Sequence, residues 1–321
     1  MSALFRLLKK PPVSALGILG FHQITPTPAQ PFLSPRFPEL FESLCKKLAA
    51  RYDCVTIGEA AARLRERRFG SRPMVAIIFD DGYADVATTI APILRRVGVP
   101  ATSFVIVNCL VTGELPWYEE LGRIVYETPR DRFRIDLGAQ ALEWSLPPTR
   151  REREAVYWEI VRKLKADFRR DLQKSMALAH RAHEVAPFDP AKSKSMLTVE
   201  GARAAMAAGI EIGCHSLSHP ILPNLEDAEI EFEIAGGRSQ LERLIGAPVR
   251  SFCFPNGDND RRCVAAVEHA GYVAAVSMSC GPNHAGSYDP FRLRRVPMSE
   301  SMTATWPWHT TLRVRTTLND D

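Results

Sequence analysis

Short runs of apolar residues alternate with amphipathic stretches along most of the chain. An uninterrupted apolar run of this length predicts a strand that is buried on both faces, as in a parallel sheet. The predicted strands are 15–21, 54–57, 75–79, 101–107, 210–214, 251–254, 273–276 and 291–296. Because amphipathic helices are predicted between most of them, the order of elements indicates an α/β fold with parallel strands and right-handed crossovers.

Helical spacing of apolar residues predicts the helices that connect these strands. They cover residues 38–51, 58–67, 85–97, 198–208, 225–245 and 260–270. Thr56 and Thr198 stand where N-caps are expected, and Gly98 stands where a helix should end. Pro92 lies inside one predicted helix, so this helix either is kinked or begins late.

Residues 113–197 interrupt the alternation and are predicted to form a mostly helical insertion. A helix is expected at 117–126, a hairpin at 133–144 and a long charged helix or helix pair at 149–184. His180 and His183 are interpreted as surface histidines of the charged segment. We expect the insertion to roof or flank a cleft.

A chain of 321 residues can bury a large core, and 45% hydrophobic with 24% charged residues is typical of a soluble globular protein. We predict one domain over residues 1–300, followed by a C-terminal tail, 301–321. The proline-rich stretch 25–38 should be an irregular loop. A net charge of +4 is too small to indicate a nucleic-acid partner.

The seven cysteines are odd in number and irregularly spaced, which favours free thiols in a reducing compartment. The first apolar run, 15–21, is too short to span a bilayer, and no small-residue cleavage site follows it. A cytoplasmic protein without a transmembrane span is therefore predicted. Residues 4–10 mix leucines and a phenylalanine with basic residues; a frayed terminus is the favoured interpretation, and a peripheral membrane anchor is the alternative.

Two acidic residues, Asp80 and Asp81, directly follow the predicted strand 75–79, and Gly82 comes next. Carboxylates beside a buried strand are costly to ionise without a metal, a cation or hydrogen-bond donors. For an Asp-Asp-Gly sequence alone, the favoured interpretation is a turn in which one acid caps the next helix. Other polar groups at strand ends change this picture.

His215 and His219 follow the predicted strand 210–214, four residues apart, and Pro220 favours a loop or a single turn there. Reactive groups in parallel α/β folds gather at the carboxyl ends of the strands. One carboxylate from Asp81 and two imidazoles make a three-ligand set. Such a set leaves positions open for water and substrate, as a catalytic zinc site requires.

Three segments, in this order, resemble the first three signature motifs of the polysaccharide deacetylases, carbohydrate esterase family 4. They are Phe79–Gly82 (FDDG), His215–Pro220 (HSLSHP) and Phe252–Gly257 (FCFPNG). The flanking segments 19–24 and 92–105 also resemble the family, so that the similarity covers roughly 15–107 and 198–296. It implies an irregular (β/α) barrel of about seven parallel strands, interrupted here by the helical insertion.

The resemblance implies a metal-dependent hydrolase that removes N-acetyl groups from amino sugars in a polysaccharide, an oligosaccharide or a lipid-linked glycan. Asp80 would be the general base. Asp81, His215 and His219 would bind a divalent metal, most commonly zinc, with cobalt or nickel as alternatives. The backbone N–H of Asn256, after Pro255, would stabilise the oxyanion.

The chain departs from the family pattern at two places. Cys253 occupies the position of a frequent arginine two residues before the third-motif proline. The late Leu-x-His motif, whose histidine acts as general acid, is replaced by Leu293–Pro297 (LRRVP). His22, at the end of the first predicted strand, is the main candidate for protonating the leaving amine, and His309 is a weaker one. For His22 a purely structural role is an equally good interpretation.

Two rival functions stay open at this stage. The first is the hydrolysis of another amide, such as formyl release from a lipid-linked amino sugar. The second is a carbohydrate-binding relative without turnover, for which the missing Leu-x-His motif is the only support.

Overall fold

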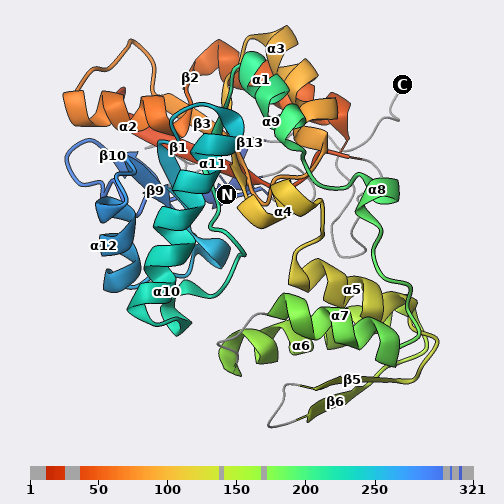
Figure 1. Cartoon of the computed structure of the whole chain (residues 1–321). Coiled ribbons are helices and arrows are strands. Elements are labelled where there is room, and N and C mark those ends of the chain that lie inside the picture. The colour runs from red at the N-terminus through yellow and green to blue at the C-terminus, as the bar shows by residue number, and fades with distance from the viewer. Residues whose placement is uncertain are drawn as a thin grey trace, which may run out of the picture.

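The computed structural model describes residues 12–25, 37–136, 141–167, 172–298, 304–305 and 311–312. Its centre is a curled, nine-stranded sheet of order β10-β1-β3-β4-β7-β8-β9, in which β2 also pairs with β3 and β11 with β1 (Figure 1). The strands are β1 Ala15–Phe21, β2 Asp53–Cys54, β3 Met74–Phe79, β4 Ala101–Val105, β7 Ile210–Cys214, β8 Ser251–Cys253, β9 Ala274–Val276, β10 Asn283–His284 and β11 Val296–Pro297. All pairs are parallel except β1 with β10.

The segment from Leu293 to Pro297 connects β9, at one end of the curled sheet, with β1, near the other end. Leu293 forms a single parallel bridge with Val276 of β9, and Val296–Pro297 pairs with Leu19 and Gly20 of β1. The predicted last strand, 291–296, is thus reduced to one bridge and a two-residue strand. The sheet with its helices has the half-barrel form expected of an irregular (β/α) barrel.

Alternate residues of the central strands face two different hydrophobic clusters. In β3, Val75, Ile77 and Phe79 join one cluster, whereas Met74, Ala76 and Ile78 join the other. This follows from the two-residue repeat of a strand, which turns successive side chains to opposite faces. The burial of both faces explains why these strands are unbroken apolar runs.

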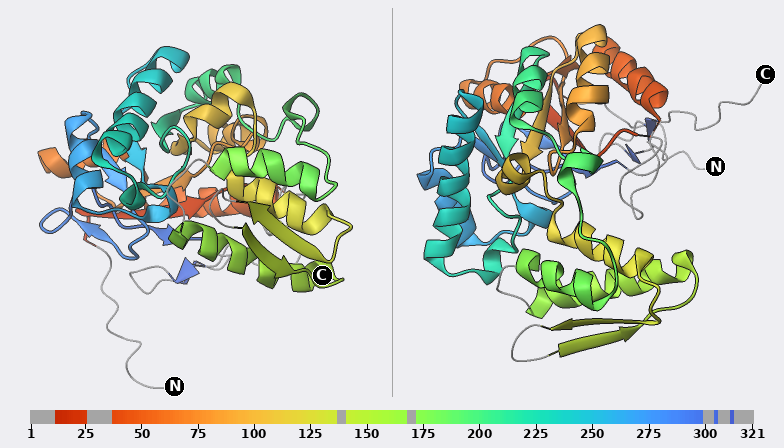
Figure 2. Two further views of the ribbon diagram at one scale, coloured as in Figure 1. Left: turned by 60° about the horizontal axis from the view of Figure 1, so that its bottom comes forward. Right: turned by 45° about the vertical axis from the view of Figure 1, so that its right-hand side comes forward.

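The helices cover the sheet as the amphipathic pattern predicts (Figure 2). They are α1 Pro38–Arg51, α2 Ile57–Glu66, α3 Ala91–Val97, α4 Val107–Thr112, α9 Val199–Ala207, α10 Asp227–Glu231, α11 Gly237–Ile245 and α12 Arg261–His269. Two π-helical turns, Val86–Ile90 and Phe232–Gly236, interrupt the predicted helices 85–97 and 225–245. Thr56 caps α2 through Glu59 N, as expected, so the predicted strand 54–57 ends at Cys54. The helix α4 was not predicted.

The insertion forms a second body against one end of the sheet (Figure 1). It contains α5 Trp117–Glu127, the hairpin of β5 Arg132–Asp136 and β6 Ala141–Ser145, α6 Arg150–Asp167, α7 Leu172–Ala182 and α8 Pro190–Ser193. These elements build a hydrophobic cluster of their own, which includes Trp117, Phe133 and Tyr157. The helix, the hairpin and the helix pair are therefore confirmed.

The interpretation of His180 and His183 as surface histidines is wrong, because both are buried in this second cluster. His180 Nε2 lies 2.8 Å from Glu120 Oε2. The His183 ring stacks on Phe133 at a centroid distance of 4.8 Å, and its Nε2 lies 2.7 Å from the carbonyl oxygen of Arg134. Although α6 and α7 carry many charged residues, their apolar residues form part of the cluster in which both imidazoles are buried.

All seven cysteines are free thiols, as expected. Within the described part of the chain, no helix is both long and apolar enough to cross a bilayer. The cytoplasmic location and the division into residues 1–300 and 301–321 stay predictions. Residues 4–10, most of the loop 25–38 and His309 lie outside the described residues.

Candidate active site

A tight turn at the end of β3 separates the two adjacent carboxylates. Asp81 and Gly82 both have left-handed backbone conformations, with φ of 71° and 78°. A Cβ on Gly82 would lie 3.0–3.2 Å from atoms of Val105, so only glycine fits the turn without displacing β4. The Asp80 side chain consequently meets Arg295, while Asp81 faces the histidines of the second motif.

Asp81, His215 and His219 converge on one point. Asp81 Oδ1 lies 3.5 Å from His215 Nε2 and 3.7 Å from His219 Nε2, and all three side chains are buried. One ligand atom from each residue lies within 4.8 Å of the others. These three side chains therefore lie close enough together to share one cation.

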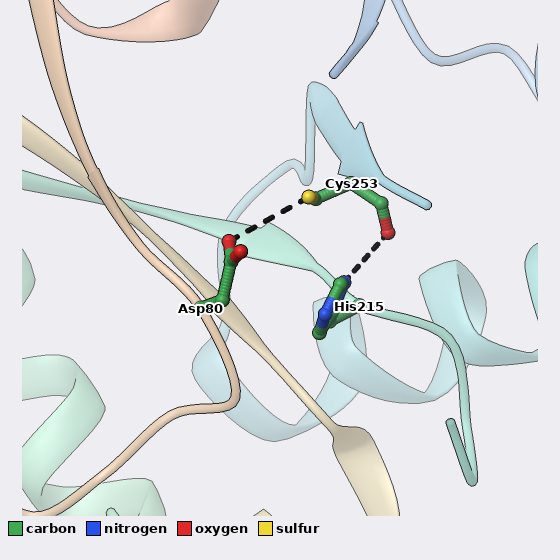
Figure 3. A group of neighbouring side chains, drawn as sticks. All are labelled: Asp80, His215 and Cys253. Carbon is green, nitrogen blue, oxygen red and sulfur yellow. Dashed lines mark hydrogen bonds between the residues drawn. The ribbon is translucent and has the colours of Figure 1, made fainter. Parts of the chain in front are cut away.

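The donor chemistry of this triad also fits a divalent transition metal. His215 Nδ1 lies 2.7 Å from the carbonyl oxygen of Cys253 (Figure 3). Because a carbonyl oxygen only accepts, Nδ1 carries the proton and Nε2 keeps its lone pair toward Asp81. Burial, reinforced by the neighbouring His215 and Lys165, holds the pKa of His219 well below its usual value. Two neutral imidazoles and one carboxylate are a suitable ligand set for zinc.

The loop that carries both histidines is held by a residue that the sequence analysis missed. Glu233, on the π-helical turn, accepts hydrogen bonds from the backbone N–H of Leu217 and Ser218 and from the Ser218 hydroxyl, at 2.6–3.0 Å. Ser216 and His219 have positive φ, and Ser216 Oγ accepts from His219 N. The segment is a loop, as Pro220 indicated.

Asp80 forms a buried ion pair with Arg295, another residue without a predicted role. Arg295 Nη1 donates to Asp80 Oδ2, and Arg295 Nε and Nη2 contact Met278 Sδ at 3.0 and 2.7 Å. Burial opposes ionisation of Asp80, but attraction chiefly to the Arg295 guanidinium outweighs it and lowers the pKa from 3.8 to about 2. Asp80 is therefore ionised at pH 7.

Cys253 occupies the place where the resemblance led us to expect an arginine. Its thiol lies 3.6 Å from Asp80 Oδ1 (Figure 3), and burial raises its pKa well above the usual value. The neutral thiol supplies no positive charge. Arg295, which reaches Asp80 from the segment that replaces the Leu-x-His motif, supplies it instead.

His22 lies at the rim of the same site. Its Nε2 is 4.0 Å from Asp81 Oδ2, and 48% of its side chain is exposed, whereas Asp81, His215 and His219 are buried. It follows β1 directly, as predicted, and thus stands on the side of Asp81 away from β4 in the strand order. The position allows contact with both solvent and a bound substrate.

The third motif forms a single 3-10 turn, Pro255–Gly257, after β8. Asn256 has a φ of 54°, and Gly257 has a φ of 77° with the Met278 backbone N only 2.4 Å from a would-be Cβ. Asn256 Oδ1 accepts a hydrogen bond from Lys165 Nζ of the insertion. The turn is thereby fixed on both sides.

A profile described as "Polysaccharide deacetylase" matches residues 68–128 and 183–275. These ranges contain the Asp-Asp-Gly turn, both histidines and the third-motif turn, and leave out most of the insertion. The chain belongs to the polysaccharide deacetylase family. The resemblance inferred from three motifs is confirmed, and with it the broad class of a hydrolase that acts on amide bonds of polysaccharides.

Solved structures of other deacetylases share the fold at low sequence identity. The Streptococcus pyogenes deacetylase PplD, in complex with acetate, is 15% identical, with a TM-score of 0.59 over 89% of this chain and 95% of that one. IcaB from Ammonifex degensii is 16% identical, with a TM-score of 0.57 over 92% and 95%. The deacetylase domain of BpsB from Bordetella bronchiseptica gives 14% and 0.53 over 89% and 96%. A comparison with curated proteins gave no match.

In this member of the polysaccharide deacetylase family, the insertion contributes side chains to the site. The Tyr118 ring lies 5.1 Å from the His219 ring. The Tyr83 hydroxyl stands between Asp81 Oδ2, at 3.3 Å, and Oε1 of the fully buried Glu119. Burial, followed by repulsion from Asp81, raises the pKa of Glu119 well above its usual value. A protonated Glu119 that donates to Tyr83 leaves the tyrosine hydroxyl free to donate to Asp81.

Proposed function

We propose that the protein is a metal-dependent deacetylase that hydrolyses N-acetyl groups of amino sugars in a polysaccharide, an oligosaccharide or a lipid-linked glycan. The observation that supports this is that two adjacent carboxylates have different environments, each suited to a different role. Asp81 faces two imidazoles at ligand distance, while Asp80 is ionised and held apart by Arg295. Family membership supplies the reaction class.

Asp81, His215 and His219 would hold the metal, with zinc expected first and cobalt or nickel as alternatives. A divalent metal held there would lower the pKa of water and polarise the acyl carbonyl. The His215 Nδ1–H bond to Cys253 and the Tyr83 hydroxyl near Asp81 orient two of the ligands.

The remaining residues accept a proton, stabilise the oxyanion and donate a proton. Asp80 takes a proton from the attacking water, and Arg295 keeps the carboxylate ionised until then. The Asn256 backbone N–H, which Pro255 helps to position, donates to the acyl oxygen as negative charge develops on it. His22 gives a proton to the amine as the carbon–nitrogen bond breaks. The products are a carboxylate and a free amino sugar.

Mass spectrometry of products from a panel of N-acetylated and N-formylated amino-sugar glycans, with the metal varied, tests the activity. We expect acetate release by the zinc-, cobalt- or nickel-loaded protein. Formate release alone would identify the deformylase alternative, and glycan binding without any acid release would identify a non-catalytic relative.

Metal content tests the ligand assignment separately. The wild-type protein should bind one equivalent of zinc, and Asp81→Ala should lose both the metal and the activity. Asp227→Asn, which changes a carboxylate that is 80% exposed and pairs with Arg262, is the matched control and should keep both. Equal zinc content in wild type and Asp81→Ala would contradict the assignment.

A further inference from the structure

Helix α6 of the insertion reaches the barrel and brings one cation to the third motif. Lys165, near the end of this helix, donates from Nζ to Asn256 Oδ1. The carbonyl oxygen of the same lysine accepts from Asn224 Nδ2 of the barrel at 3.1 Å. The side chain and the main chain of Lys165 are thus both attached to loops that surround the metal-binding triad, although the helix belongs to another body of the fold.

The ammonium group of Lys165 has capacity to bind something more. An ammonium has three N–H donors, and among the described residues one acceptor, a neutral amide oxygen, is assigned to it. No described carboxylate lies within ion-pair distance of it. Burial lowers the pKa of Lys165. Asp258 and Asp81, which lie beyond ion-pair distance, oppose this effect by electrostatic attraction. A largely buried cation without an acidic partner is unfavourable unless a negative group can approach it.

The neighbouring amide shows a second unused donor. Asn256 Nδ2 is buried and has no hydrogen-bond partner among the described residues. Since its Oδ1 accepts from Lys165, this side chain is oriented by the lysine. Two donor groups, the ammonium and the amide, therefore lie together beside the turn whose backbone N–H is assigned to the acyl oxygen.

We propose that Lys165 binds the acyl oxygen of the substrate together with Asn256 and stabilises the negative charge that forms on this oxygen during hydrolysis. The inference rests on the proposed function. It also gives the insertion a chemical role: α6 completes a site whose other parts come from the barrel strands. A cation adds electrostatic stabilisation that a single backbone N–H cannot provide.

The charges of the site agree with this role. The three carboxylates of Asp80, Asp81 and Asp258 exceed the two cations, Arg295 and Lys165, by one charge, so a divalent metal leaves the site with one excess positive charge. This excess favours the state in which the substrate carries most negative charge, which is the tetrahedral oxyanion. Without Lys165 this excess positive charge would be lost.

The strand order separates Lys165 from the leaving group. Asn256 follows β8 and His22 follows β1, and three strands, β3, β4 and β7, lie between β1 and β8 in the sheet. The triad sits at the ends of β3 and β7. The acyl oxygen on the side of Asn256 and the amine on the side of His22 would then occupy opposite sides of the triad.

Two substrates distinguish oxyanion binding from proton donation. Hydrolysis of an N-acetylglucosamine oligomer needs a proton for the leaving amine, whereas 4-nitrophenyl acetate has a leaving group that departs without one; both pass through an oxyanion. Lys165→Met should lower kcat about 100-fold on both substrates, with little change in KM and unchanged zinc content. Lys165→Arg should restore part of the loss. Lys163→Met, an exposed lysine on the same helix, is the matched control and should behave as wild type.

The outcomes on the two substrates are decisive. A loss confined to the amide would make Lys165 a proton donor and overturn the inference. Unchanged kcat on both substrates would overturn it as well. If the wild type releases no acid from any acylated sugar, the proposed function fails, and the role of Lys165 is then judged by binding.

Acetate binding supplies that separate measurement. Acetate carries its negative charge on the oxygen that the site is proposed to hold, so calorimetry on the zinc-loaded protein measures the interaction directly. The dissociation constant for acetate should rise about 10-fold in Lys165→Met and stay unchanged in Lys163→Met. Equal affinity in all three proteins, or no acetate binding to the wild type, would overturn the inference.

Discussion

Removal of the Arg295 side-chain charge tests how this site keeps Asp80, the proposed general base, ionised. Asp80 and Arg295 are 2% and 4% exposed, so Arg295→Met leaves a buried carboxylate without its cation. Breaking a buried ion pair at one partner costs about 3–5 kcal/mol. The lowering of the Asp80 pKa from 3.8 to about 2 gives a similar figure, roughly 2–3 kcal/mol at neutral pH. We therefore expect Arg295→Met to lower the free energy of unfolding at pH 7 by about 2–5 kcal/mol.

The pH dependence follows from the direction of the shift. Because the folded-state pKa of Asp80 lies below its unfolded value, the stabilisation is complete above pH ~4 and is lost as the pH falls toward ~2. In Arg295→Met, burial still raises the pKa of Asp80, but the arginine no longer offsets it. The acid limb of kcat/KM should therefore move up by more than ~1 pH unit.

The assay combines urea denaturation of the metal-free protein at pH 7 with the pH profile of kcat/KM for the zinc-loaded enzyme. Arg294→Met is the matched control, because the neighbouring arginine is exposed. The double variant Asp80→Asn with Arg295→Met should recover most of the lost stability, since the unpaired charge is gone. Wild-type stability and an unmoved acid limb in Arg295→Met would refute the reasoning.

Three further predictions concern Asp85, Glu233 and His22. Asp85 comes shortly after the Asp-Asp-Gly turn, and its Oδ2 accepts a hydrogen bond from Ile24 N. Burial raises the pKa of Asp85 to about 7, so wild-type stability should fall by up to about 4 kcal/mol between pH 4 and 8, and thermal unfolding of Asp85→Asn should show a flatter profile; equal slopes would contradict this. Glu233→Ala should loosen the loop of His219 and weaken zinc binding about 10–100-fold in a chelator competition, whereas an unchanged affinity would exclude this role. His22→Gln should slow amide hydrolysis about 100-fold or more and leave 4-nitrophenyl acetate hydrolysis nearly unchanged; parallel losses on both substrates would exclude it as proton donor.

The sequence was sufficient to predict elements whose pattern is local. β1 and β7 have the predicted bounds, because a strand buried on both faces must be an unbroken apolar run. Asp81, His215 and His219 could be placed together for the same reason. Each follows such a run, and parallel strands bring their carboxyl ends to one edge of the sheet.

Residues whose roles depend on packing could not be found in this way. Arg295 lies beside a strand of two residues, which has no periodic pattern, and nothing local indicates that its guanidinium turns inward to Asp80. Glu233 and Lys165 are charged residues on helices, where a solvated side chain is the ordinary expectation. His183 was misplaced because the core that buries it forms only when the hairpin packs on α7.

The departures from the family pattern share a physical explanation. The distance between a metal ion and a ligand atom is fixed to within a few tenths of an ångström. A ligand residue must therefore lie at one particular position, here directly after a strand. A charge that keeps a base ionised acts over a longer range and needs only proximity and burial. The cation for Asp80 can therefore come from the segment that replaces the Leu-x-His motif, while a neutral thiol, Cys253, occupies the expected arginine position. By the same argument, the proposed stabilisation of the acyl oxygen can come from Lys165, although this residue lies in an insertion outside the barrel. The three proposed metal ligands could not be supplied by the insertion, because their positions are fixed by the strand ends.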